Sequence, residues 1–310
     1  MKRLLLFLVL LVAGCTPIEY QGSDMIMDTV VTITVTSGNQ ENAQEAMQEA
    51  FLEMKRVEEK FTAHEESPIY HLNKKGFLYT EDEELKRLLR RSVYYSQISG
   101  GSFDITIRPI LSLYEKSFAQ GGPPSEEKIE KALENVGWER VIINETGVFL
   151  ENTTIDLGGI AKGYAIDRGI ETLQEENISA ALVNAGGDLA GYGRKSSGDL
   201  WVSALRNPDE KDEYIEYFEI NNEAVATSGN YERYFDESKE FHHIVNPKTG
   251  KSANECISVT VIAPSAAQAD ALSTALFVMG SEGKELARAM GVSALFVFEN
   301  RSIELVNREP

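Results

Sequence analysis

The stretch Ile155-Asp-Leu-Gly-Gly-Ile-Ala-Lys-Gly-Tyr-Ala-Ile-Asp167 places two adjacent glycines where a predicted strand gives way to a predicted helix. Lys162 falls in the first turn of that helix. Free backbone N–H groups, the positive helix end and a cation together suit an anion such as phosphate. The stretch is not a Walker A loop, because that loop needs Gly-x-x-x-x-Gly-Lys-Ser/Thr. On spacing alone, a tight turn with an exposed lysine is the simpler interpretation.

Helices and strands are predicted on both sides of this junction. Alternating apolar and polar residues predict a strand over 29–36, and apolar residues spaced at three and four predict a helix over 42–61. A capping box at 80–83 predicts a helix that ends near residue 97. Further helices are expected over 125–136, 160–175, 266–279 and 284–290, a hairpin within 141–150, and strands over 180–183, 200–205, 214–220, 257–263, 294–298 and 303–306. Helices and hairpins mix without regular βαβ alternation, which predicts an α+β fold.

Composition narrows the class of protein. The chain has 310 residues, a formal net charge of −19, 42% hydrophobic residues and two cysteines. The apolar fraction is sufficient for a packed core. The acidic balance argues against a general nucleic-acid binder, which brings lysine and arginine to the phosphates. Two cysteines cannot form a disulfide framework, and Cys256 is expected to be a small buried hydrophobic residue.

The first residues have the pattern of an export signal. Lys2 and Arg3 precede an apolar run over 4–13, which is too short to span a bilayer but suits a signal peptide over 1–14. Val12-Ala-Gly-Cys15 resembles a lipobox. Cleavage there would remove Lys2 and Arg3 and so change the formal net charge from −19 to −21. We expect a lipid (palmitate) on Cys15, a tether over 15–26 and a bacterial cell-membrane location facing the extracytoplasmic side. Ordinary signal cleavage with an incidental cysteine is the alternative.

Asp270 and Thr274 lie four residues apart in an apolar predicted helix and therefore share one face. Carboxylate and hydroxyl oxygens suit Mg²⁺, which takes its remaining ligands from phosphate and water. Taken alone, the pair is better explained as a mildly polar stripe on an amphipathic helix.

Three other segments carry weaker signals. His242 and His243 are neighbours, so on a strand only one of them would face a site. Gly100-Gly-Ser-Phe-Asp104 is better explained as a helix end with a solvated carboxylate than as a loop that exposes Phe103 for stacking. Asn184-Ala-Gly-Gly-Asp188 predicts either a turn or a close approach of the backbone.

Taken together and in this order, these segments resemble the FAD:protein FMN transferase family (ApbE-like flavin transferases). The matching pieces are 27–33, 67–73, 100–104, 155–163, 184–188, 226–229, 243–250 and 269–274. The resemblance implies one ApbE-like flavin transferase domain over 27–310, with mixed, largely antiparallel sheets packed with helices. Asn246 departs from the family's usual Asp, and Ala63 stands near a position where an aromatic residue is common.

The resemblance also implies the chemistry. FAD would be the substrate and Mg²⁺ the metal, the FMN moiety would pass to a threonine hydroxyl of a client protein, and AMP would leave. Asp270 and Thr274 would bind Mg²⁺ together with the backbone carbonyl near Ala161. His243 would assist deprotonation of the threonine. The positions that match those associated with FAD are Met27, Ser102, Phe103, Asp104, Asp156, Lys162, His243 and Ile244.

Two other functions stay open at this point. An Mg²⁺-dependent FAD pyrophosphatase would use the same phosphate site with water as nucleophile. A non-enzymatic FAD-binding lipoprotein would need neither a metal nor a base. The expected partners of the transferase are FAD, an exported or membrane redox client and the membrane itself.

Overall fold

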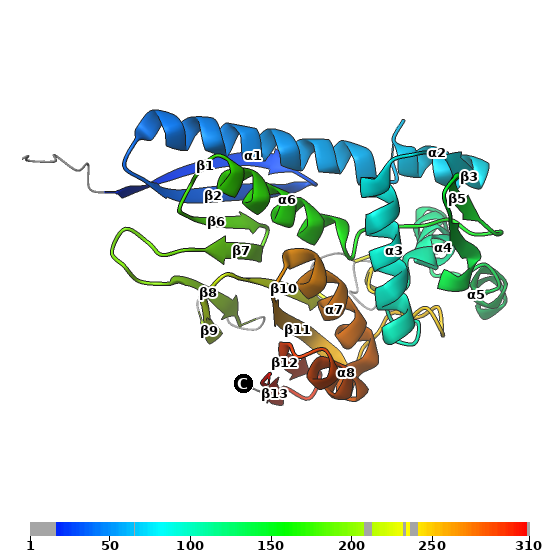
Figure 1. Ribbon diagram of the computed structural model, residues 1–310. Helices are drawn as coiled ribbons and strands as arrows, with labels where there is room; N and C mark the ends of the chain where they lie inside the picture. The colour runs from blue at the N-terminus through cyan, green and yellow to red at the C-terminus, as the bar shows by residue number, and fades with distance from the viewer. Residues whose placement is uncertain (1–16, 65, 208–212, 232–233, 236–240, 309–310) are drawn as a thin grey trace, which may run out of the picture.

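A single antiparallel sheet organises the chain in the computed structural model, which describes residues 17–64, 66–207, 213–231, 234–235 and 241–308. The sheet has eight strands in the order β1-β2-β6-β7-β10-β11-β12-β13 (Figure 1). The strands are β1 (Ile18–Ile26), β2 (Thr29–Ser37), β6 (Ala180–Ala185), β7 (Asp188–Tyr192), β10 (Glu223–Gly229), β11 (Cys256–Ala263), β12 (Ser293–Phe298) and β13 (Ile303–Val306). Every neighbouring pair is antiparallel, which confirms the predicted α+β class.

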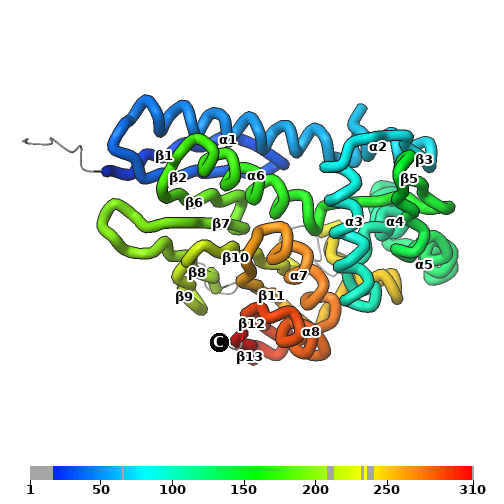
Figure 2. Tube along the Cα trace, in the orientation of Figure 1, coloured from blue at the N-terminus to red at the C-terminus, as the bar shows by residue number. Residues whose placement is uncertain are grey.

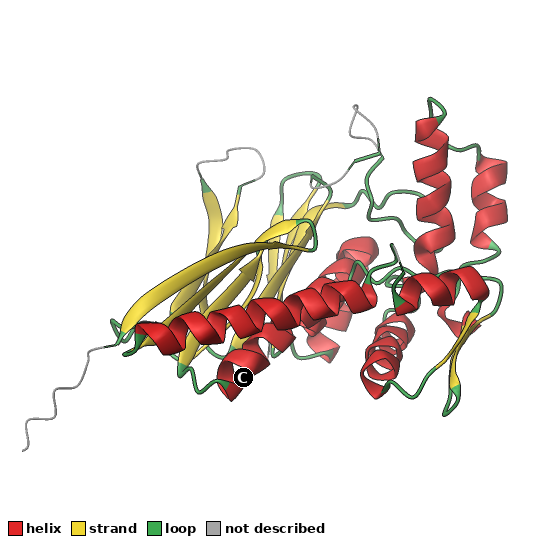
Figure 3. Cartoon of the chain, turned by 90° about the horizontal axis from the view of Figure 1, so that it is seen from above, coloured by secondary structure: helices red, strands yellow, loops and turns green. Residues whose placement is uncertain are grey.

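Helices cover one face of this sheet. They are α1 (Gln40–Phe61), α6 (Ala161–Glu175), α7 (Ala266–Met279) and α8 (Gly283–Ala289), and Figure 3 shows this helical layer against the strands. The opposite face packs against the small sheet of β8 (Trp201–Arg206) and β9 (Tyr214–Ile220). The main core therefore lies between the helices and the eight-stranded sheet.

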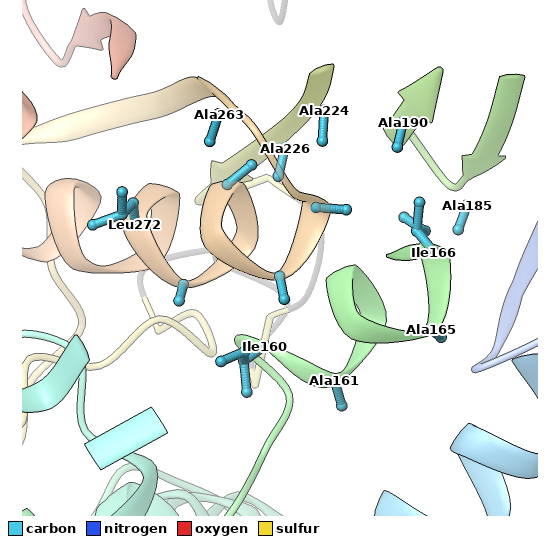
Figure 4. Packing of buried hydrophobic residues seen from close by; sticks show 14 of the residues in the cluster. Ile160, Ala161, Ala165, Ile166, Ala185, Ala190, Ala224, Ala226, Ala263 and Leu272 are labelled. Carbon is cyan, nitrogen blue, oxygen red and sulfur yellow. The ribbon is translucent and has the colours of Figure 1, made fainter. Parts of the chain in front are cut away.

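Small residues let the helices pack closely on the sheet and on each other. Figure 4 shows Ala224, Ala226 and Ala263 of the sheet turned toward α7. A Cβ added at Gly169 of α6 would lie 3.0 Å from the sulfur of Met54 in α1. Close packing of this kind leaves little room for α6 to shift between its two neighbouring helices.

A second group of elements lies beside the sheet. It contains α2 (Pro68–Lys75), α3 (Glu83–Ile98), α4 (Arg108–Ala119), α5 (Glu126–Leu133) and a sheet of β3 (Phe77–Tyr79), β5 (Gly147–Leu150) and β4 (Val141–Ile143). Short 3₁₀ turns cover Ile105–Ile107, Trp138–Arg140 and Gly280–Glu282. Figure 2 shows β1 beginning at the end of the molecule far from this group and running toward it.

The structure corrects the predicted tether over 15–26. Residues 18–26 form β1, which pairs along its whole length with β2. β1 is an edge strand with one exposed face, and it therefore contains many polar residues. Its alternation of apolar and polar residues is weak, so its pairing with β2 and not its sequence identifies it as a strand. The signal peptide, Cys15 and Thr16 lie outside the described residues. Within the described part of the chain, no helix has the length and apolar character needed to cross a membrane.

Two local predictions are settled by the structure. The cap of α3 is Asp82, whose carboxylate accepts the N–H of Leu85 at 3.0 Å, and not Thr80 as the capping box predicted. Thr80 instead accepts the N–H of Asp82 at 3.0 Å.

Cys256 is fully buried as predicted, and burial raises the pKa of its thiol to about 12.

Glu84 links three helices at the start of α3. Its carboxylate accepts bonds from Arg56 at 2.6 Å and Lys60 at 2.6 Å, both on α1, and from Tyr164 of α6 at 2.8 Å. Burial by itself raises the pKa of Glu84, but the bonds from Arg56, Lys60 and Tyr164 outweigh it and lower the pKa to about 2. The ionised carboxylate is therefore the form that stabilises the fold.

We predict that Glu84→Gln lowers the free energy of unfolding at pH 7 by about 1–3 kcal/mol, the range for bonds to a charged group. The contribution is fully present above the ordinary pKa of 4.5 and is lost as the pH falls toward about 2. Urea unfolding of wild type and variant at pH 7 and pH 3 measures it. The exposed Glu81→Gln is the control; an equal loss in both variants, or a difference that does not shrink in acid, would contradict the prediction.

Candidate active site

A cleft of about 560 Å³ opens where the sheet meets the second group of helices. This volume is within the range of about 300–1,000 Å³ that is usual for small-molecule sites. Its wall is formed by the start of α6, the middle of α7, the end of β10, the β1–β2 turn and the loop after α3. Every predicted FAD and metal residue lines this cleft: Met27, Ser102, Phe103, Asp104, Asp156, Ala161, Lys162, His243, Ile244, Asp270 and Thr274. The structure thus brings them together, while their chemical roles stay predictions.

The first half and middle of α7 carry two oxygen donors, Asp270 and Thr274. Asp270 is only 5% exposed, and its Oδ2 accepts the N–H of Gly163 at 3.0 Å. Thr274 lies one turn further along α7, with its hydroxyl 3.2 Å from that of Ser228 on β10. A Cβ at Gly159 would lie 3.2 Å from the Thr274 hydroxyl and 3.1 Å from the ring of Phe103. Any larger residue at position 159 would therefore fill the space beside the Thr274 hydroxyl.

The N–H groups at the start of α6 are less available than the sequence suggests. Gly158 donates to Asp156, Ala161 donates to the carbonyl of Leu157 at 2.8 Å, and Gly163 donates to Asp270. The N–H group of Gly163 at this helix end is therefore already bonded to the Asp270 carboxylate.

Lys162 has a buried partner that the sequence did not reveal. Its Nζ lies 3.0 Å from Oδ2 of Asp188, which is 3% exposed. The other oxygen of Asp188 accepts the N–H of Thr227 at 3.0 Å. The segment 184–188 was the available signal, but only the packing of α6 against β7 places its carboxylate beside Lys162.

The loop after α3 differs from its predicted form. Two glycines at 100–101 with φ of 57° and 81° follow the helix, in agreement with the predicted helix end. The Asp104 carboxylate is buried, not solvated: it accepts bonds from the N–H and hydroxyl of Thr106 and from the N–H of Trp138. Burial raises the pKa of Asp104. Phe103 is 3% exposed and presents only a small part of its ring to the cleft.

The β1–β2 turn brings Met27 into the cleft in an unusual conformation. Met27 and Asp28 have φ of 53° and 58°, the left-handed pair of a tight two-residue hairpin turn. Such angles are uncommon for a residue other than glycine, asparagine or aspartate. The N–H of Met27 donates to Glu58 of α1 at 2.7 Å, and this bond holds the turn against the helix.

One histidine of the pair faces the cleft, as predicted. His243 lines it, whereas His242 is 3% exposed and bonds through Nε2 to the carbonyl of Ala253 at 2.7 Å. Burial lowers the pKa of His242. Asn246 accepts the N–H of Lys248 at 2.9 Å, a turn bond that an amide can make without a charge. Ala63 and His64 both line the cleft.

Two further residues support the site and were not predicted. Asn73 of α2 bonds to both backbone groups of Ile155, at 2.7 and 2.8 Å, and so holds the beginning of the glycine segment. Arg108 lies with Nη1 3.6 Å from Oδ2 of Asp156, on the cleft wall. Asn73 ends the segment 67–73, which carried no chemical interpretation in the sequence.

Relatives of this chain are known in sequence. The ApbE family model matches residues 27–296. The FAD:protein FMN transferase of Klebsiella pneumoniae is 32% identical over 264 residues, which cover 81% of this chain and 82% of the relative. The FAD:protein FMN transferase of Treponema pallidum is 28% identical over 314 residues and covers 92% of this chain and 86% of the relative.

Solved structures agree with the sequence relatives. The ApbE protein of Thermotoga maritima has 35% identity and a TM-score of 0.86, covering 92% of this chain and 96% of that structure. The flavinyl transferase ApbE of Pseudomonas stutzeri has 26% identity and a TM-score of 0.82, covering 93% and 94%. With the family model matched from the β1–β2 turn to β12, this chain belongs to the ApbE family.

Proposed function

We propose that this protein transfers the FMN moiety of FAD to a threonine hydroxyl of a client protein, with Mg²⁺ as cofactor. One observation carries the proposal beyond family membership. The oxygen donors Asp270 and Thr274, the cation Lys162 and the imidazole of His243 all line one cleft of suitable size. This combination suits the cleavage of a diphosphate with transfer to a hydroxyl group.

The residues present fit an Mg²⁺ ion. The carboxylate of Asp270, the hydroxyl of Thr274 and the backbone carbonyl of Ala161 are the oxygen ligands that Mg²⁺ prefers. The absence of a side chain at Gly159 leaves space beside the Thr274 hydroxyl. When bound, the ion would neutralise the charge of the diphosphate.

The rest of the cleft offers complementary surfaces for FAD. Lys162 and Arg108 would pair with phosphate oxygens, while Met27, Phe103 and Ile244 offer apolar surface to a ring system. Ser102, Asp104 and Asp156 complete the set that we propose contacts FAD.

The transfer step balances as a displacement at phosphorus. The threonine oxygen of the client forms a bond to the phosphorus of the FMN moiety, and the bond from that phosphorus to the AMP oxygen breaks. His243 accepts the hydroxyl proton, and AMP leaves as an anion. If water takes the place of threonine, the products are FMN and AMP, so the transferase and the pyrophosphatase differ only in the nucleophile.

We also propose that Cys15 carries a lipid anchor on the extracytoplasmic side of the cell membrane. The lipobox-like segment Val12-Ala-Gly-Cys15 supports this location. The client would then be an exported or membrane redox protein, because only such a protein can meet the cleft. Release of the protein from membranes of Cys15→Ser cells would support the anchor, and unchanged retention would contradict it.

A single incubation tests the function. The soluble domain from residue 17 onward is mixed with FAD and Mg²⁺, with an exported redox subunit or its Thr→Ala form as acceptor. We expect a fluorescent acceptor band with an equal amount of AMP, and the loss of both with a chelator. AMP and FMN without a band would favour the pyrophosphatase, and intact bound FAD would favour the non-enzymatic carrier.

We predict that Asp270→Asn lowers Mg²⁺-dependent AMP release at least about 100-fold, because a charged ligand is lost while the acceptor for Gly163 is kept. The measurement is AMP release against Mg²⁺ concentration. Gln268→Ala, on the same helix, is the control and should keep its rate. A near-normal rate for Asp270→Asn would rule out the metal assignment.

His243→Ala should slow transfer by about 10²–10⁴-fold, the usual contribution of a general base. FAD affinity, measured by fluorescence titration without acceptor, should change much less. His71→Ala, outside the cleft, serves as the control. A loss of affinity with an unchanged rate at saturating FAD would make His243 a binding residue instead.

Gly159→Ala should reduce turnover by about 10- to 100-fold, because the new methyl group would displace Thr274 or Phe103 by a fraction of an ångström. The thermal midpoint should stay near that of wild type, since both contacts are to side-chain atoms. Gly122→Ala, where a methyl group meets nothing within 4 Å, is the matched control. Full activity in Gly159→Ala would show that the open space is not needed.

A further inference from the structure

We infer that Asp167 is a positioning residue that fixes the register of α6 against α7, and through it the spacing between the Ala161 carbonyl and the side chains of Asp270 and Thr274. The inference rests on the proposed function only in assigning Mg²⁺ to those oxygens. Asp167 does not line the cleft, and it acts through the two helices that do.

The carboxylate of Asp167 reaches from α6 to the first turn of α7. Its Oδ1 accepts the N–H of Ala266 at 2.6 Å, and its Oδ2 accepts the N–H of Ala267 at 3.0 Å. N–H groups in the first turn of a helix have no partner within that helix. Asp167 therefore satisfies two of them from a different element, which ties the helices together.

A reciprocal bond lies one turn away on each helix. Gly163, four residues before Asp167, donates its N–H to Asp270, four residues after Ala266. Each helix thus supplies a carboxylate to backbone N–H groups of the other, in an antiparallel arrangement. Two such contacts fix both the rotation and the sliding of α6 relative to α7.

The two helices approach so closely that α6 cannot slide along α7 to form these bonds in another register. A Cβ at Gly163 would lie 2.3 Å from the carbonyl oxygen of Ala266, so backbone meets backbone at this point. Figure 4 shows Ala161 and Ala165 on α6, close to the start of α7. A helix displaced by even part of a turn would change the distance between the Ala161 carbonyl and Asp270.

Ser265 provides a natural comparison at the same helix end. It is the cap of α7 and accepts the N–H of Gln268 at 3.4 Å, while Arg91 of α3 donates to its hydroxyl at 2.6 Å. Ser265 therefore stabilises the start of α7 without any bond to α6. A substitution of Ser265 should therefore lower stability without changing the register of α6 against α7.

The test compares Asp167→Asn with Ser265→Ala in the soluble chain from residue 17 onward, with Mn²⁺ as the probe. Electron paramagnetic resonance measures Mn²⁺ affinity, and thermal unfolding measures stability. We expect Asp167→Asn to bind Mn²⁺ at least about 10-fold more weakly, as is typical for loss of a residue that supports metal ligands. Ser265→Ala should lower the thermal midpoint, because it removes the cap of α7, and should still bind Mn²⁺ within about two-fold of wild type.

Asp167→Glu is the second variant, because it keeps the charge and lengthens the reach by one methylene. We expect it to fold and to bind Mn²⁺ more weakly than wild type. Wild-type affinity in either Asp167 variant, or equal losses in Asp167→Asn and Ser265→Ala, would overturn the positioning role. Absence of Mn²⁺ binding in wild type would instead overturn the metal assignment of the proposed function, and this inference with it.

Discussion

The bond from the Gly163 N–H to the Asp270 carboxylate is the contact on which the cleft depends. It joins the start of α6, which carries Ala161 and Lys162, to the middle of α7, which carries Thr274. A carboxylate at the positive end of a helix is stabilised in its ionised form. The same interaction thus holds two helices together and keeps a negative charge in the cleft. The close approach at Gly163 requires small residues, because a Cβ there would meet the backbone of Ala266.

Long elements with a strong period were predictable from the sequence. The helices at 40–61, 161–175 and 266–279 end within two residues of their predicted limits, because each has an extended apolar face or a clear cap. Shorter or uniformly buried elements were not predictable. The strand β7 is buried on both faces and has no alternation, and α4 continues directly from the 3₁₀ turn at Ile105–Ile107 without a capping bond. Such elements are defined by neighbours that are distant in sequence.

The candidate site followed the same division. The local sequence motifs identified residues that line the cleft, because each motif contains the chemical groups that the site uses. Their partners were not predictable. Asp188 reaches Lys162 only because α6 packs against β7, and Asn73 reaches Ile155 across 82 positions of chain. The tether prediction was wrong for the same reason, since pairing with β2 and not composition makes residues 18–26 a strand.

The charge of the cleft explains why a dication would be needed at all. The chain is acidic, with a net charge of −19, and FAD brings a diphosphate to a wall that already holds Asp156, Asp188 and Asp270. Lys162 is shared with Asp188, and Arg108 lies near Asp156, so part of the positive charge of each cation is already offset. A dinucleotide would therefore meet a cleft whose own cations are partly neutralised. Under the proposed function, a divalent ion beside Asp270 would supply the missing positive charge next to the phosphates. In such a cleft, metal binding and substrate binding would be coupled, because each ligand would reduce the electrostatic cost of binding the other.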